Sequence, residues 1–373
     1  MSLAVTNSAP AGARQQLTGW RKFSAMPHGL DDCALAIPTY CRPAILLRLL
    51  ERLVELPDRP GDVVVVDGSP NDEVGRALEA WAKARDLPYD LAYVQSPAGL
   101  TLQRNVSIDA AADKAYIFFL DDDCLPEPGY FRQIRQVFVD DKTGEIGGVR
   151  GFLTNGIHLP LTRLWKLRVA LGLAKLGAPG KYYDTGSSGS WNAVPTFSGI
   201  RPVDVLSGGA AGYRREVFLK HRFSRYFCGY AQGEDMEFSL RIRRDWTLMV
   251  CGDAFVYHDH AHGGRPAGFA RARMAMRNRY FIWKRYSPQA QVIDQFKFWM
   301  DHLLIIAYNL GSFLRAPKEP NLLAYAWGTF YGMIECLLNP PSYDEPPPRK
   351  EFEFALKPLC SQLNSETFAV EAR

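Results

Sequence analysis

The stretch that decides the fold reads Tyr116-Ile117-Phe118-Phe119-Leu120-Asp121-Asp122-Asp123. Five consecutive apolar residues are typical of a short strand that is buried on both faces, because a strand with one wet face would alternate. Three carboxylates follow where this strand ends. Crowded carboxylates repel one another, and a divalent cation that prefers oxygen ligands, such as Mg²⁺ or Mn²⁺, relieves the repulsion. The stretch predicts a buried strand with a metal site at its carboxyl end, and a solvated turn is the alternative.

The residues around this strand alternate between apolar runs and helical periodicity. Strand-like runs occur at 33–37, 63–66 and 91–94, and helical spacing occurs at 45–56, 72–85 and 103–112. This alternation predicts an α/β fold with a mostly parallel sheet that helices cover on both faces. Ligands of such sheets bind at the carboxyl ends of the strands. The polar clusters at 38–42, 67–69 and 121–123 all follow strands, so we expect them to meet at one edge.

The composition is that of a globular protein. Of the 373 residues, 47% are hydrophobic and 23% are charged. Lys and Arg number 44 against 40 Asp and Glu, a net charge of +4, which is a small excess for a nucleic-acid binder, and we expect no nucleic-acid partner. Seven cysteines stand singly without a C-x-x-C pair, and residues 1–30 contain no secretory signal. These features favour a reducing, cytoplasmic compartment.

Composition divides the chain into four regions. Residues 1–30 are rich in small and polar residues without periodicity and are expected to form a flexible arm. Residues 31–264 hold the alternating strands and helices and are expected to form the catalytic domain. Residues 265–340 are expected to form a helical extension, and residues 341–373 a Pro-rich tail.

Six short motifs follow one another in an order that is typical of a known family. They are Pro38-Thr39-Tyr40-Cys41-Arg42, Val65-Val66-Asp67-Gly68-Ser69, Gly99 to Asn105, Asp121-Asp122-Asp123, Gly208-Gly209-Ala210 and Gly233-Glu234-Asp235. Each is weak alone, but their order resembles a family 2 glycosyltransferase of the GT-A fold. The resemblance implies a nucleotide-diphosphate-sugar donor, a divalent cation (Mn²⁺ or Mg²⁺) and a glycan or lipid-linked acceptor in polysaccharide or glycoconjugate biosynthesis. The second motif departs from the commoner D-D-G-S pattern, which leaves the base and the sugar open.

The resemblance also implies roles for single residues. The donor-binding residues would be Pro38, Thr39, Arg42, Asp67, Arg104, Asp121, Asp122 and Gly209. The metal ligands would be Asp121, Asp123 and His258. For Asp67 a turn-forming role before Gly68 is a fair alternative, and for Arg104 the alternative is a solvated helix charge.

The general base is expected at the start of a helix. An acceptor hydroxyl becomes a good nucleophile when a carboxylate takes its proton. Asp235 is the first choice and Glu234 the second, while the alternative for both is that acids at a helix start complement the helix dipole. One attack on the anomeric carbon, with no protein nucleophile, implies inversion. Alternate histidines 258, 260 and 262 would face one side of an extended segment and so could bind metal together, and surface histidines are the alternative.

Other enzyme classes fit these motifs less well. A haloacid-dehalogenase phosphatase would carry Thr or Val where Leu125 stands. A nucleotidylyltransferase would want a Gly-rich loop in place of Pro38-Thr39-Tyr40. A non-catalytic glycan-binding protein on the same fold would have lost the acids, which are present here.

The helical extension carries a second expectation. Residues 265–285 contain seven Lys and Arg and no acid, and apolar stretches follow at 303–314 and 322–334. Each stretch is shorter than the roughly 20 residues of a spanning helix. We therefore expect helices that lie peripherally on the inner face of a membrane. The alternative is that they pack on the catalytic domain or form a dimer interface.

Overall fold

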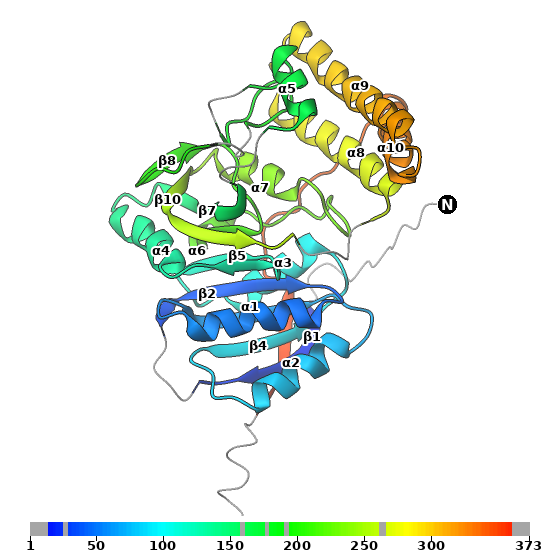
Figure 1. Ribbon diagram of the computed structural model, residues 1–373. Helices are drawn as coiled ribbons and strands as arrows, with labels where there is room; N and C mark the ends of the chain where they lie inside the picture. Colours follow the sequence, from blue (N-terminus) through cyan, green and yellow to red (C-terminus); the bar gives the residue numbers. More distant parts are fainter. Residues whose placement is uncertain are drawn as a thin grey trace, which may run out of the picture.

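The computed structural model describes residues 14–24, 29–156, 161–175, 179–189, 194–260 and 266–359. Strands and helices alternate through the first half, as the apolar runs predict, and three long helices come near the end (Figure 1). The strands are β1 (Gln15–Lys22), β2 (Leu30–Thr39), β3 (Pro60–Asp67), β4 (Asp90–Gln95), β5 (Tyr116–Leu120), β6 (Cys124–Pro126), β7 (Ile146–Leu153), β8 (Ile200–Val203), β9 (Ala210–Arg214), β10 (Thr247–His258) and β11 (Phe352–Pro358). The helical segments are α1 (Pro43–Glu55), α2 (Glu73–Lys83), α3 (Leu100–Ala110), α4 (Tyr130–Asp140), the short 3-10 helix η1 (Thr154–Gly156), α5 (Arg163–Ala170), α6 (Arg215–Lys220), α7 (Glu234–Ile242), α8 (Gly268–Tyr286), α9 (Val292–Arg315) and α10 (Pro320–Leu338).

The strands of the described residues form a single mixed sheet. Its order is β11-β1-β4-β3-β2-β5-β9-β7-β10-β6, and β8 pairs with β10. The central block of β4, β3, β2 and β5 is parallel throughout. Strand β9 runs antiparallel between β5 and β7 and joins this block to the second half of the sheet. The predicted α/β fold with a mostly parallel sheet is therefore confirmed, with antiparallel strands added at the flanks.

The unbroken apolar runs are explained by cores on both faces of the sheet. One core, which includes the buried leucines of α1, receives Leu35, Ile37, Val63 and Val65. The core on the other face includes Val106 and Ile108 of α3 and receives Ala34, Ala36, Val64 and Val66. Successive residues of a strand point to opposite faces, so a strand between two cores needs an apolar residue at every position.

Two segments that were expected to lack structure are strands, and this corrects the predicted arm and tail. Strand β1, from the predicted arm, pairs antiparallel with β4, and β11, from the predicted tail, pairs parallel with β1. Leu17 and Phe352 are buried in the sheet's core, and the backbone N–H groups of Glu351 and Phe352 donate to the Asp109 carboxylate. Edge strands pair through the backbone and need few apolar residues. Residues 1–13, 25–28 and 360–373 lie outside the described part.

Helices α8, α9 and α10 form a layer beyond the sheet, at the opposite end of the molecule from β1 and α2 (Figure 1). Gly328 and Gly332 of α10 face Phe269 and Met276 of α8, where an added Cβ would collide, so small residues allow the two helices to pack closely. The residues 261–265, which contain the predicted boundary at 264, lie outside the described part. No helix of the described residues combines the length and hydropathy needed to cross a membrane.

Candidate active site

A cavity of about 740 Å³ opens where the carboxyl ends of β2 and β5 meet the start of α7. The predicted residues on its wall are Pro38, Thr39, Arg42, Asp121, Asp123, Glu234, Asp235 and His258. Four segments far apart in the sequence supply them, because the parallel strands end at one edge and β10 ends beside β6. The predicted clustering of polar residues at this edge is therefore observed.

The acid triplet does not act as one group, because its three side chains point to different partners. Asp122 is fully buried, accepts a hydrogen bond from Thr39 Oγ1 (2.7 Å) and pairs with Arg42 Nη2 (2.5 Å). Burial raises the pKa of Asp122 to about 7, although the Arg42 charge opposes the shift. Asp122 does not line the cavity itself, and its contact with the donor stays a prediction. Its side chain holds Arg42, which does line the cavity.

The third acid forms the candidate metal site. Asp123 Oδ1 lies 3.2 Å from His258 Nε2, and with Cys124 Sγ these ligand atoms all lie within 4.8 Å of one another. Burial raises the pKa of the Cys124 thiol well above its usual value. The Asp123 carboxylate is therefore the donor of this group that suits Mn²⁺ or Mg²⁺ best, and the His258 imidazole is the other available ligand. The ring of His260 lies 4.1 Å from that of His258, but His260 has a φ of 52° and does not continue the extended strand. His262 lies outside the described residues.

The first acid belongs to a buried network rather than to this group of metal-ligating atoms. Arg104 is 1% exposed, and its guanidinium lies 2.8 Å from Glu234 Oε1 and 3.4 Å from Asp121 Oδ1. A Cβ on Gly209 would collide with the Asp121 carboxylate, so glycine at 209 leaves room for that side chain. Neither Arg104 nor Gly209 lines the cavity, and their predicted donor contacts stay predictions. In the structure Arg104 contacts Asp121 and Glu234, and Gly209 lies against Asp121.

The two candidate bases have different surroundings. Glu234 is bound to Arg104, and burial, together with the nearby charge of Asp235, raises the pKa of Glu234 to about 8. Asp235 is partly exposed and accepts hydrogen bonds only from backbone N–H groups among the described residues, 2.7 Å from Met236 and 3.3 Å from Gly208. Asp235 is thus the carboxylate that can receive a proton from a ligand in the cavity.

Asp67 lies beneath the cavity and not on its wall. Its Oδ1 accepts hydrogen bonds from the backbone N–H (2.8 Å) and the hydroxyl (2.5 Å) of Ser69, and its Oδ2 accepts one from Tyr93 (2.9 Å). This is the turn-forming role weighed as the alternative. Asp67 thus shapes the loop after β3, and its contact with the nucleotide stays a prediction.

Sequence reasoning missed three residues of the site. Gln103 Nε2 donates to the carbonyls of Thr39 and Val66 at 2.8 Å each and ties the loops after β2 and β3 to α3. Gln232 lines the cavity, and its buried Oε1 accepts no hydrogen bond from the described residues. Asn278 of α8 donates to the Gln232 carbonyl at 2.7 Å. Proximity to the predicted motifs was a signal for Gln103 and Gln232, whereas nothing in the sequence marks Asn278.

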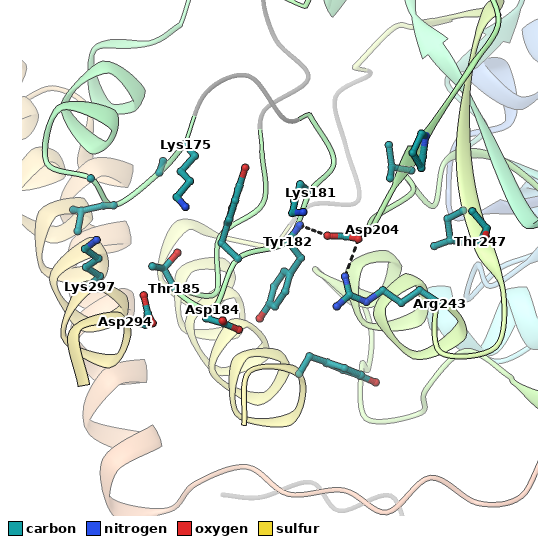
Figure 2. Close-up of a pocket in the computed structure, with 18 of the residues that line it drawn as sticks. Lys175, Lys181, Tyr182, Asp184, Thr185, Asp204, Arg243, Thr247, Asp294 and Lys297 are labelled. Atoms are coloured by element: carbon teal, nitrogen blue, oxygen red, sulfur yellow. Dashed lines mark hydrogen bonds and ion pairs between the residues drawn. The ribbon is translucent and has the colours of Figure 1, made fainter. Parts of the chain in front are cut away.

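A second cavity of the same size lies between residues 172–175 and 181–185, the end of α7 and the start of α9 (Figure 2). It contains none of the predicted site residues. Its acid Asp204 is bound to Arg243 (2.9 Å) and to the backbone N–H of Tyr182 (2.9 Å), and its acid Asp294 caps α9. The two cavities have equal volume, so the chemistry of their walls identifies the first as the candidate active site.

Two solved structures share the fold of this chain, which is the GT-A fold. The structure titled GalNAc-T7 with UDP, GalNAc and Mn²⁺ matches with a TM-score of 0.52 and 14% identity, over 84% of this chain and 58% of that chain. The mannosyltransferase PcManGT from Pyrobaculum calidifontis, in complex with GDP-Man and Mn²⁺, matches with a TM-score of 0.50 and 13% identity, over 86% of this chain and 90% of that chain.

The chain belongs to glycosyl transferase family 2, whose family model matches residues 34–222, and it is a glycosyltransferase. A comparison with curated proteins finds no match. The matched segment contains the acid triplet and Gly209 but ends before Asp235 and His258. The chain spans 58% of the length of the GalNAc-T7 structure, so the substrates of that protein are not assigned to this chain.

Proposed function

We propose that this chain transfers one sugar from a nucleotide-diphosphate donor to a hydroxyl of a glycan or lipid-linked acceptor, with inversion and with the help of Mn²⁺ or Mg²⁺. One observation carries the proposal: Asp235 and the pair Asp123–His258 face the same cavity. A base and a site for positive charge then flank one space, which is what displacement of a diphosphate by a hydroxyl requires.

Asp235 would be the general base. Its carboxylate is held by the backbone N–H groups of Met236 and Gly208, which orient it without occupying all of its acceptor positions. Glu234 is bound to Arg104 and cannot turn toward the cavity without leaving a buried guanidinium short of a partner. A hydroxyl that loses its proton to Asp235 attacks the anomeric carbon, the diphosphate leaves from the opposite side, and the configuration inverts.

Asp123 and His258 would hold the cation, and Arg42 would meet the diphosphate. A bound divalent cation supplies positive charge to the leaving diphosphate. Arg42 supplies a fixed positive charge on the cavity wall, because Asp122 anchors its guanidinium. Both GT-A structures compared here were solved with Mn²⁺ and a nucleotide or nucleotide sugar, which supports a metal-dependent donor site in this chain.

A donor screen with purified protein tests the proposal. Release of nucleoside diphosphate is measured for a panel of nucleotide sugars with Mn²⁺, with Mg²⁺ and with excess chelator. We expect release from one class of donor, only with metal, and its loss in Asp123→Ala. Asp113→Ala, a substitution of an exposed aspartate outside the cavity, is the matched control and should behave as wild type. Full turnover in saturating chelator would contradict the metal site.

A further inference from the structure

The outer faces of α9 and α10 form an exposed apolar surface. Thirteen of the twenty large apolar side chains that are exposed in the described part of the chain lie on these two helices, so the exposure is concentrated and not scattered. We call these thirteen the outer face: Val292, Ile293, Phe296, Leu303, Leu310, Leu314, Leu323, Trp327, Phe330, Tyr331, Ile334, Leu337 and Leu338. Exposed apolar residues scattered singly need no explanation, but so many on two neighbouring helices indicate a binding surface.

The inner faces of the same helices are already buried, so the outer face is not a misplaced core stripe. On α9 the buried side chains are Phe298, Asp301 and His302. On α10 the inner residues are small, such as Gly328 and Gly332 against α8. Helix α10 contains a single charged residue, Glu335, which pairs with Arg273 and Arg277 of α8. A helix that is apolar all round belongs inside a protein core or against lipid.

The net positive charge of the surrounding helices indicates which kind of partner would bind the outer face. Residues 161–175, which include α5, and residues 266–338 together contain thirteen Lys and Arg against four Asp and Glu, a net charge of +9. The whole chain carries +4, so the rest of the protein carries −5. Arg315 and Lys318 are exposed at the turn between α9 and α10, and Arg163 and Lys166 are exposed on α5. Apolar residues next to clustered cations are typical of binding to anionic lipids.

A second copy of the chain is the competing occupant. Leu323, Trp327, Phe330, Ile334 and Leu337 repeat at intervals of four and three residues, which is the spacing of a coiled-coil seam. A seam between two such layers would bring two charges of +9 together. The segment 320–338 also lacks the paired acids and bases that commonly flank a seam and set its partner. Charge therefore favours an anionic surface over a second copy.

We propose that α9 and α10 lie on the anionic face of a membrane with the outer face in the lipid. The cytoplasmic leaflet fits, because it is anionic and because the single cysteines suit a reducing compartment. Helices of 24 and 19 residues that do not qualify as spanning segments would lie along the surface. Helix α8 touches both sides: it packs against α10, and its Asn278 binds the Gln232 carbonyl beside the candidate base. Docking would then confine the enzyme to the surface that carries a lipid-linked acceptor.

Vesicle flotation with the full chain tests this docking. The vesicles contain phosphatidylcholine with about one third phosphatidylglycerol or phosphatidylcholine alone, each at low and high salt. We expect the chain to float with the anionic vesicles at low salt and less at high salt. The double variant Leu310→Glu/Trp327→Glu should lower the partition coefficient by at least about tenfold, since two buried apolar groups become charges.

Leu219→Glu is the matched control, because Leu219 on α6 is 65% exposed and Trp327 is 59% exposed. Circular dichroism and melting temperature check that all variants fold. The proposal is overturned if wild type stays unbound with anionic vesicles, if it binds neutral vesicles equally well, or if the control loses as much binding as the double variant. A dimer in light scattering that the double variant splits, without flotation, would assign the outer face to a second copy and also overturn it. Flotation is read without any donor sugar, so its outcome is independent of the donor screen.

Discussion

The candidate active site and the outer face both contain side chains in unfavourable surroundings, but in opposite senses. The active site buries charged groups, and the outer face exposes apolar groups to water. Around the cavity, charged groups are buried and held by partners: Arg104 lies between Glu234 and Asp121, and Asp122 holds Arg42. On the outer face, large apolar groups such as Trp327 meet water. The cavity has its supporting contacts within the chain, whereas the outer face is completed only by a partner. A surface that is unfavourable in the isolated chain indicates binding more clearly than one whose groups are already paired.

The largest expected effect is the loss of turnover when Asp235, the candidate base in the cavity, is replaced. Asp235→Asn keeps the shape of the side chain but removes the base, so kcat should fall by about two to four decades while donor affinity stays near wild type. Melting temperature should change little, since Asp235 accepts only backbone hydrogen bonds among the described residues. Steady-state kinetics and donor titration measure the two quantities.

Glu234→Gln is the paired variant for this test. Glu234 balances the buried Arg104, so its substitution should lower stability in urea unfolding. If Asp235→Asn turns over normally while Glu234→Gln is stable but inactive, the general base is Glu234 and not Asp235.

The second effect tests whether the inner side of the helical layer is a true core. Asp301 is buried between Arg168 of α5 (2.6 Å) and Arg279 of α8 (2.8 Å). Asp301→Asn removes the negative charge that lies between the two arginines. We expect a loss of about 3 kcal/mol in the free energy of unfolding. Asp294→Asn on the same helix alters a more exposed capping group and should cost about 1 kcal/mol. Equal losses in urea unfolding would mean that α9 is not packed as the structure has it.

The third effect is a pH dependence located in the same core. Burial, followed by the charge of Arg279, lowers the pKa of His302 from its ordinary value near 6.5 to about 3. Asp301 opposes this shift and Arg168 adds to it. The folded state thus binds fewer protons than the unfolded state below pH 6.5, so stability falls as pH falls through that range.

At pH 5 the contribution of His302 to this loss is about 2 kcal/mol. His302→Gln does not titrate, so its stability should fall less than that of wild type between pH 7 and pH 5 by that amount. Urea unfolding at the two pH values measures the difference. Identical slopes for both proteins would show that His302 is accessible to protons in the folded state.

The smallest effect concerns Gln232, which lines the cavity and whose buried Oε1 accepts no hydrogen bond from the described residues. If Gln232 Oε1 accepts a hydrogen bond from the acceptor substrate, Gln232→Ala should raise the acceptor KM by about fivefold to tenfold, the value of about one hydrogen bond. The donor KM and kcat should stay close to wild type. Gln289→Ala, in the exposed turn after α8, is the control. An effect on kcat alone would place Gln232 with the base rather than with the acceptor.

The central strands could be predicted because burial on both faces requires an apolar residue at every position of the strand. Strand β5 has the predicted bounds, 116–120, since both of its faces are buried and each position must be apolar. Strands β1 and β11, which form one end of the sheet, could not, because backbone pairing holds them and polar residues allow such pairing. The positions of Pro38, Thr39 and Asp123 on one cavity wall could be predicted from the topology of a parallel sheet, whereas Asp235 was placed there by the family resemblance.

What the sequence by itself determined is the α/β fold, the edge of the sheet where the site lies, and the family, because apolar runs and short motifs are local patterns. Only the tertiary structure decided what each acid does. Asp121, Asp122 and Asp123 are consecutive, yet one faces Arg104, one is buried against Arg42, and one pairs with His258. The physical reason is that a carboxylate takes its role from the charges and the burial around it, and here strands and helices from distant parts of the chain supply both.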